Sequence, residues 1–249
     1  MKKCAYFLFA LLLSAPTLAT EWSFVGQDIE PFFFQDDKLQ TNGVFKDVAN
    51  EICAKMRNSC SFTIMPFRRS LESVSSGTAT FVGPLALTPD RKDMFKFSDV
   101  VVRSAYTFYG QEKEIMSLKS IEDLKGKTIG VHSPSATEKS LLLLNEKLGN
   151  AIKIVNETGV ETAIKKSQAN RYNLSYINQD IARAWIKNNG VKDLFEASFT
   201  GDHVDYRFAF APQTDAKVLE EFNRELQELK DKGGLDKIVM KYLKRKAIP

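Results

Sequence analysis

The chain has 249 residues, of which 43% are hydrophobic and 27% charged, and its net charge is +4. This length suits one large or two small domains, and the composition is ordinary for a globular protein. So small a net charge argues against nucleic acid or an anionic membrane surface as the partner.

The first 19 residues have the pattern of a cleavable export signal. Lys2 and Lys3 form a basic start, Ala5–Leu13 is an unbroken apolar run, and Thr17–Ala19 offers small residues for cleavage. An apolar run of about nine residues is far short of the roughly 20 that span a bilayer. No later segment of the sequence is apolar enough to span one. We therefore expect residues 1–19 to be removed and the mature protein to be periplasmic.

Two cysteines, Cys53 and Cys60, remain after this processing. An even pair in an exported chain favours a disulfide. Cys53 lies near the end of a helical pattern and Cys60 begins the next strand, so a bridge would fasten a helix–strand turn. A redox pair is disfavoured because the spacing is not Cys-x-x-Cys.

The first half of the mature chain alternates strands with helices. A helix opening at Gly43 has its apolar residues on one face, from Val44 to Met56. The other elements expected here are strands over 22–26, 61–65 and 79–85 and a helix over 68–76. This rhythm predicts a parallel sheet covered by helices on both faces.

A second series of the same kind begins at Tyr106. We expect strands over 106–109, 128–132, 152–155, 174–177 and 206–211, and helices over 121–124, 135–147, 161–167 and 179–188. Two further helices close the chain. The last covers 235–243, and the one before it has these apolar residues on its inner face: Val218, Leu219, Phe222, Leu226 and Leu229. Gly233 and Gly234 between them are typical of a helix end.

Three runs of residues carry a family resemblance: Pro66–Leu71, Leu87–Arg91 and Phe97–Asp99. Their order resembles lobe 1 of the periplasmic solute-binding proteins of family 3, which serve amino-acid importers, and this chain looks like a divergent member. The resemblance implies an α/β fold of two lobes, each a mostly parallel sheet flanked by helices. Residues 20–105 with 206–249 would form lobe 1 and residues 106–205 lobe 2. Hinge crossovers would lie near 103–106 and 202–205.

The resemblance makes Arg91 the partner of a ligand carboxylate, because the family pairs this arginine of its Thr-Pro-x-Arg run with one. A guanidinium offers two parallel N–H donors that match a carboxylate. Thr88 could add its hydroxyl. The alternative is a structural arginine paired with Asp93 or Asp99.

Phe67 and Arg69, which follow the strand over 61–65, are further candidates for ligand contact. Strand ends in open α/β sheets are where ligands bind, and the resemblance makes Phe67 an apolar platform under the ligand. Arg69 is a second candidate for anion contact. The alternatives are that Phe67 belongs to the core and that Arg69 is a solvated helix residue.

In the expected lobe 2, Ser135 and Glu138 have the spacing of a capping box. A helix N-terminus that faces a cleft also attracts anions, so Ser135 and Thr137 are candidates for the carboxylate. The alternative is that Ser135 only caps the helix. His132, at the end of a strand, is a further candidate for ligand contact.

The resemblance also implies an acidic partner for the ligand's amino group, near the end of the strand over 174–177. Asn178 aligns with that position, and an asparagine accepts hydrogen bonds but adds no charge. Asp180 would replace it if the register shifted by two residues. Glu30 lies in a loop just before Phe32 and is another source of negative charge. We count Glu30 and Phe32 among the candidate ligand-binding residues.

The sequence thus predicts a monomeric, non-enzymatic protein that captures a small, amino-acid-like carboxylate by hinge closure for an ABC importer. The alternative partner is a membrane sensor. No cofactor is expected, and the two histidines, His132 and His203, have no metal-site spacing. The rival function is a dehydratase-like enzyme on the same fold. It would need a general acid or base in the cleft, for which Glu30 and His132 are the candidates.

Overall fold

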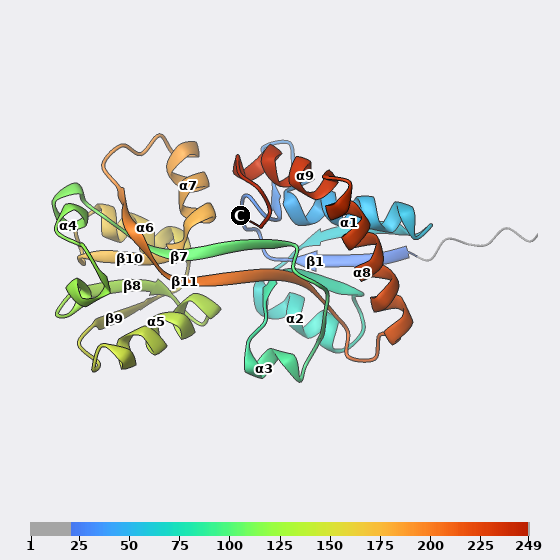
Figure 1. The fold of residues 1–249 in the computed structure, drawn as a ribbon, viewed down its shortest axis with the longest axis horizontal. Coiled ribbons are helices and arrows are strands. Elements are labelled where there is room, and N and C mark those ends of the chain that lie inside the picture. The colour runs from blue at the N-terminus through green and yellow to red at the C-terminus, as the bar shows by residue number, and fades with distance from the viewer. Residues whose placement is uncertain (1–20, 249) are drawn as a thin grey trace, which may run out of the picture.

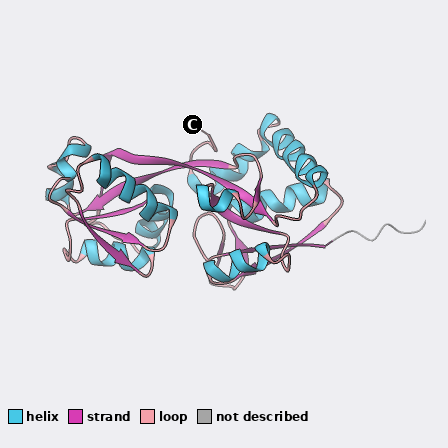
Figure 2. Cartoon of the chain, turned by 90° about the horizontal axis from the view of Figure 1, so that it is seen from below, coloured by secondary structure: helices cyan, strands magenta, loops and turns pink. Residues whose placement is uncertain are grey.

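A computed structural model describes residues 21–248, and the predicted export signal lies outside these residues. The chain forms two lobes (Figures 1 and 2). Two long strands, β7 (Val102–Gly110) and β11 (Phe195–Phe210), run from one lobe into the other. The predicted α/β class and two-lobed fold are confirmed.

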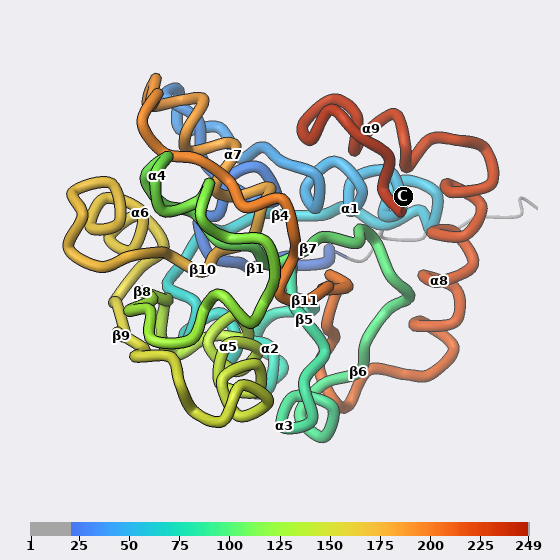
Figure 3. Tube along the Cα trace, turned by 60° about the vertical axis from the view of Figure 1, so that its left-hand side comes forward, coloured from blue at the N-terminus to red at the C-terminus, as the bar shows by residue number. Residues whose placement is uncertain are grey.

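The first lobe packs helices around strands from both ends of the chain. Its main strands are β1 (Glu21–Gly26), β4 (Ser59–Ile64) and β5 (Phe81–Ala86). Its main helices are α1 (Val44–Lys55), α2 (Phe67–Ser75), α8 (Ala216–Asp231) and α9 (Gly234–Leu243). Shorter elements are β2 (Phe34–Gln35), β3 (Thr41–Asn42), α3 (Pro89–Lys92) and β6 (Lys96–Phe97). Figure 3 shows α8 and α9 side by side over this lobe, where the chain ends.

The second lobe is built from the middle of the chain. Its strands are β8 (Thr128–His132), β9 (Lys153–Glu157) and β10 (Leu174–Asn178). Its helices are α4 (Glu112–Met116), the 3₁₀ turn Ile121–Leu124, α5 (Ala136–Lys147), α6 (Val160–Gln168) and α7 (Gln179–Asn188). Within residues 21–248, no helix is both long and apolar enough to span a bilayer.

One continuous sheet links the lobes in the order β4-β1-β5-β11-β7-β10-β8-β9. The strands at each end are parallel, whereas β11 and β7 pair antiparallel with each other and with their neighbours β5 and β10. In the middle, Arg103 pairs with Asp205 and Tyr106 with Asp202. The connection between the lobes is therefore a two-stranded ribbon.

The core of the first lobe is a cluster of aromatic rings. Phe81 lies 5.1 Å from Phe24 and 5.5 Å from Phe208, measured between ring centroids, and Phe222 of α8 lies 5.3 Å from Phe208. All four rings are fully buried. Aromatic pairs at these separations add to the stabilisation from burial alone. The cluster gives this lobe a rigid base for the residues that face the second lobe.

Cys53, near the end of α1, and Cys60, at the start of β4, form a disulfide. The predicted pairing is confirmed. The bridge links a helix and the strand that follows it, as expected from the positions of the two residues in the pattern.

Candidate ligand-binding site

A cleft lies between the two lobes, and we call the part that meets the connecting strands the inner cleft. The first lobe lines it with Phe32, Phe67 and Arg91, and the second lobe with His132, Ser135 and Thr137. Tyr106 of β7 and Tyr206 of β11 line it from the connecting strands. The structure thus brings six of the predicted site residues together.

Arg91 is the buried cation of the inner cleft. It is 8% exposed, and its Nη1 donates to the carbonyl oxygen of Ala86 at 3.1 Å. Its Cζ lies 5.3 Å from the ring centroid of Phe67. Burial lowers the pKa of Arg91, and the nearby Asp90 partly offsets this. Arg91 forms no ion pair with an acidic side chain of residues 21–248, so neither Asp93 nor Asp99 is its partner. An anionic ligand would supply the missing charge.

Thr88 and Arg69 lie outside the inner cleft. Thr88 precedes α3 and lines an adjoining hollow that shares Ala86 and Tyr106 with the inner cleft. Its hydroxyl oxygen is buried and has no hydrogen-bond partner in the described part of the chain. Arg69 is exposed on α2. The Thr88 hydroxyl is therefore covered by protein rather than presented to the inner cleft, and Arg69 faces solvent.

The start of α5 forms the facing wall. Ser135 Oγ accepts from the backbone N–H of Glu138 at 3.0 Å and donates to the carbonyl oxygen of His132 at 2.6 Å. Glu138 Oε1 accepts from Ser133 Oγ at 2.7 Å, so only the serine half of the predicted capping box forms. Ser135 therefore caps the helix, and its only proton is used within the protein.

His132 and Thr137 complete this wall. Burial lowers the pKa of His132, and Glu138 partly opposes the effect. A lowered pKa keeps the imidazole neutral at pH 7. The wall of the second lobe therefore presents neutral hydrogen-bonding groups to the cleft.

Tyr106 and Tyr206 were not among the predicted site residues. Burial raises the pKa of Tyr106 to about 12 and that of Tyr206 well above its usual value, so both phenols stay neutral. The ring of Tyr206 lies 5.1 Å from that of Phe32. Their positions beside the two expected crossovers were the available signal, because a cleft between lobes meets the connecting strands there.

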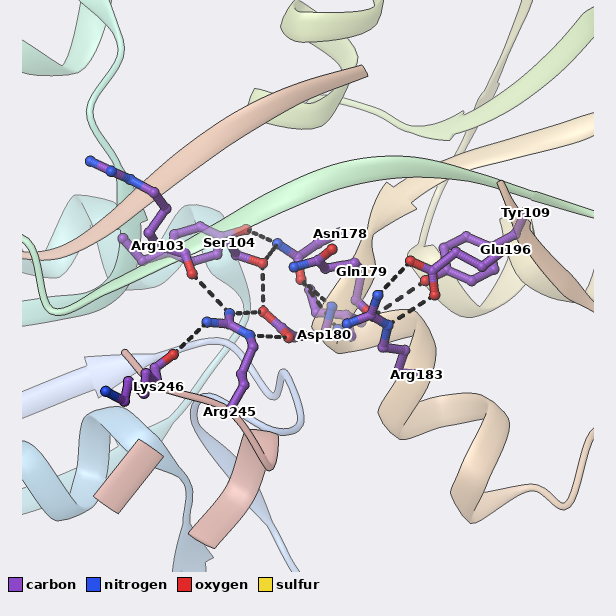
Figure 4. Close-up of polar contacts among 12 residues, drawn as sticks. Arg103, Ser104, Tyr109, Asn178, Gln179, Asp180, Arg183, Glu196, Arg245 and Lys246 are labelled. Atoms are coloured by element: carbon purple, nitrogen blue, oxygen red, sulfur yellow. Dashed lines mark hydrogen bonds and ion pairs between the residues drawn. The ribbon is translucent and has the colours of Figure 1, made fainter. Parts of the chain in front are cut away.

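Asn178 and Asp180 belong to a polar network at the start of α7 (Figure 4). Asn178 Oδ1 accepts from the backbone N–H groups of Asp180 and Ile181 at 3.0 and 3.2 Å. Its Nδ2 donates to Ser104 Oγ at 2.9 Å and to the Tyr206 hydroxyl at 3.2 Å. Asn178 is the N-cap of α7, and both ends of its amide are used within the protein.

Asp180 is 4% exposed and pairs with Arg245 from the end of the chain. Arg245 Nε donates to Asp180 Oδ1 at 3.0 Å, and Ser104 donates to Oδ2 at 2.5 Å. Figure 4 shows Arg245 reaching this carboxylate from the first lobe. The negative charge of Asp180 is thus neutralised on the side of the ribbon where the chain ends.

Glu30 lies in a second part of the cleft, which we call the outer chamber. Its lining includes Asp28, Glu30, Glu161, Trp185 and Asn188, and it meets the inner cleft at Gln27, Ile29, His132, Val160 and Ile181. Glu30 Oε2 accepts from Asn188 Nδ2 at 2.6 Å. The predicted contact of Glu30 with a ligand in the inner cleft would need that bond to be released.

Side-chain hydrogen bonds join the two walls of the cleft. Lys139 of α5 donates to Asp90 of α3 at 2.6 Å, and Asn188 of α7 donates to Glu30 in the loop after β1. They lie on either side of the inner cleft, one beside the adjoining hollow and the other in the outer chamber. The structure therefore has the two walls in contact.

Comparison with known proteins agrees with this arrangement. Residues 24–245 match the family model of bacterial extracellular solute-binding proteins, family 3. The arginine-binding extracellular protein ArtP of Bacillus subtilis is 24% identical over 222 residues, covering 86% of this chain and 82% of that protein. The lysine/arginine/ornithine-binding periplasmic protein of Escherichia coli is 24% identical and covers 97% of both chains.

A solved structure of an ancestral arginine-binding protein bound to arginine is 25% identical, with a TM-score of 0.76. It covers 89% of this chain and 97% of its own. The family model spans nearly all of the described residues, and the likeness to this structure agrees with it. The chain belongs to the bacterial extracellular solute-binding proteins of family 3.

Proposed function

We propose that this protein captures a small, amino-acid-like carboxylate in the inner cleft, with Arg91 as the anchor. The observation that carries the proposal is a buried guanidinium that faces the cleft and lacks an acidic partner in the described residues. A charge-assisted pair with a carboxylate would satisfy both its charge and its free donors. The names of the arginine- and lysine-binding relatives support an amino-acid-like solute.

Capture proceeds by hinge closure in this proposal. Residues 20–105 and 206–249 move as one lobe and residues 106–205 as the other, about crossovers near 103–106 and 202–205. The antiparallel pairing of Arg103 with Asp205 supports a hinge there, because a two-stranded ribbon bends more easily than a wide sheet. The ligand stabilises the closed form through its contacts with both walls.

The partner that reads the closed form is the permease of an ABC importer, with a membrane sensor as the alternative. The family match supports an extracellular role, and the expected export signal over residues 1–19 supports the periplasm. Only the closed form presents surfaces of both lobes in a fixed relation, so it is the form that a partner would distinguish.

A dehydratase-like activity is the second candidate that the fold permits. It would need a general acid or base in the inner cleft. None of the described residues that line the inner cleft is Asp or Glu, so the cleft holds no carboxyl group to act as the acid. Burial keeps His132 in its neutral form, which could serve as a base, but no acidic side chain is hydrogen-bonded to its ring within residues 21–248. A cleft of one arginine, aromatic rings and hydroxyls favours binding.

The experiment that tests capture is identification of the natural ligand. Protein purified without added solutes is denatured, and the released small molecules are identified by mass spectrometry. The stripped, refolded protein is then titrated with each of them by calorimetry. We expect a carboxylate that binds with one-to-one stoichiometry. A tightly bound ligand without a carboxylate, or conversion of the ligand during the titration, would overturn the proposal.

A further inference from the structure

The charge of the inner cleft is one-sided. Arg91 is the charged residue that lines it, and no Asp or Glu belongs to its lining within residues 21–248. The other polar side chains there include Gln27, His132, Ser135 and Thr137, which are neutral or nearly so at pH 7. A ligand with net negative charge therefore complements this cleft better than a zwitterion does.

Most acidic groups around the inner cleft are engaged elsewhere. In the outer chamber, Glu161 pairs with Lys165 at 2.7 Å, and Asp28 accepts from the backbone N–H of Gln35 at 3.4 Å. Asp180 is neutralised by Arg245, and Asp90 is paired with Lys139 at 2.6 Å. Glu30 lies in the outer chamber, where it accepts from Asn188. Each carboxylate would have to leave a partner to reach a ligand beside Arg91.

Two neutral acceptors near the inner cleft are committed, and the others that line it carry no charge. Asn178 Oδ1 accepts two backbone N–H groups of α7, and Ser135 Oγ accepts one from α5. An ammonium brings three N–H donors and a full positive charge. Buried beside Arg91 without a counter-ion, it would meet both a desolvation cost and repulsion from the guanidinium.

We infer that the ligand is an amino-acid-like carboxylate with no ammonium group beside the carboxylate, such as a deaminated, 2-hydroxy or N-acylated amino acid. This rests on the proposed function, since it takes carboxylate capture by Arg91 as given. The apolar wall of Phe32, Phe67 and Ile181 would hold the ligand's carbon skeleton.

Matched pairs of ligands test the inference directly. Each proteinogenic amino acid is compared with the deaminated acid that has the same side chain, for example phenylalanine with 3-phenylpropionate and arginine with 5-guanidinopentanoate. Thermal shift identifies the pairs that bind, and calorimetry measures the affinity of each member of those pairs. We expect the deaminated acid to bind roughly tenfold tighter or more in every pair that binds.

A designed variant tests the cause. Ile181 lines the inner cleft and lies in the first turn of α7, where an acidic residue is compatible with the helix. Ile181→Asp supplies the missing negative charge, and Ile181→Asn has nearly the same shape without it. We expect the aspartate variant to shift the ratio of affinities toward the amino acid by roughly tenfold or more. The asparagine variant should leave the ratio near that of the natural protein.

The outcomes separate the inference from the function on which it rests. If the amino acid of a pair binds more tightly to the natural protein, and Arg91→Ala abolishes that binding, capture stands and the inference is overturned. If Ile181→Asp and Ile181→Asn change the ratio equally, charge is not the cause and the inference fails. If no member of any pair binds, carboxylate capture itself is overturned, and the inference with it.

Discussion

The sequence predicted Arg91 as a site residue, and the structure explains how its side chain is held in the inner cleft. Its position after Pro89 places it in the short helix α3, and the strand before it ends at Ala86, whose carbonyl oxygen holds Nη1. The ring of Phe67 covers the guanidinium. These contacts fix the direction of the side chain, and the bond to Ala86 is its one side-chain hydrogen bond within residues 21–248, which suits the proposed binding role.

Arg91→Ala should abolish carboxylate binding without unfolding the protein. Truncating one partner of a buried charge pair typically costs about 2–5 kcal/mol, which corresponds to roughly 30-fold to several-thousand-fold in affinity. Arg91→Lys should restore only part, because an ammonium lacks the two-pronged geometry. Calorimetry beside a melting curve measures both properties.

Arg69→Ala is the matched control, because Arg69 is exposed on α2 outside the inner cleft. It should bind nearly as well as the natural protein. Near-normal affinity in Arg91→Ala, combined with a large loss in Arg69→Ala, would move the anion site to α2.

His132 should make stability depend on pH. Burial lowers its pKa in the folded protein, so the unfolded chain takes up the proton first as the pH falls through about 6.5. The contribution to stability is present above that pH and is lost below it. His132→Gln should therefore lose less stability between about pH 7.5 and about pH 5 than the natural protein.

Urea unfolding at the two pH values measures the effect. His203→Gln, at an exposed position, is the control and should follow the natural protein. An unchanged loss of stability in His132→Gln would contradict the assignment to His132.

Among the elements, α7 gains its position from an ion pair that joins distant parts of the chain. Asp180, in its first turn, is held by Arg245, which follows α9. The acidic residue also suits the helix N-terminus. The pair thus connects the start of a helix in one lobe to the end of the chain in the other.

Arg245→Ala should destabilise the protein by about 3 kcal/mol, because it leaves the carboxylate of Asp180 buried without its cation. Adding Asp180→Asn should recover part of the loss, since an amide needs no counter-ion. Equilibrium unfolding in urea gives both values. Lys246→Ala, next in sequence but exposed, should change little. A loss in the double variant as large as in Arg245→Ala would show that the charge of Asp180 is not the cause.

The elements that the sequence predicted well are those with a strong internal pattern. The expected helices over 135–147 and 179–188 correspond to α5 and α7 to within one residue at each end. The first part of β11 was missed, because residues 195–205 include Gly201 and Asp202, which disfavour strands in isolation. Their pairing with β7 makes them a strand, and that partner is distant in sequence.

For the site, the sequence predicted the residues that a motif or a strand end marks. Arg91, Phe67 and His132 were found in this way, and all three line the inner cleft. Tyr106 and Tyr206 were missed because their role depends on the packing of the ribbon between the lobes. The engagement of Asn178 with Ser104 was equally hidden, since the two residues are 74 positions apart.

For the whole molecule, we expect the walls of the cleft to separate in the ligand-free protein and to close when ligand binds. Small-angle scattering should give a smaller radius of gyration with the carboxylate identified from the purified protein than for stripped protein, because closure removes the open arrangement. The Arg91→Ala variant with the same carboxylate should match the stripped profile. An unchanged profile in the natural protein at saturation, from verified ligand-free material, would contradict hinge closure.

The end of the chain is fastened to the ribbon between the lobes. The backbone N–H of Arg103, in β7, donates to the carbonyl oxygen of Ala247 at 2.9 Å, and the N–H of Ala247 donates to Asp236. A purification tag added after Ala247 would lie beside the ribbon about which we propose that the lobes close, and we expect it to disturb that closure. The same location suits a fluorescent reporter, because its emission would report the proposed closure without a change to any residue that lines the inner cleft.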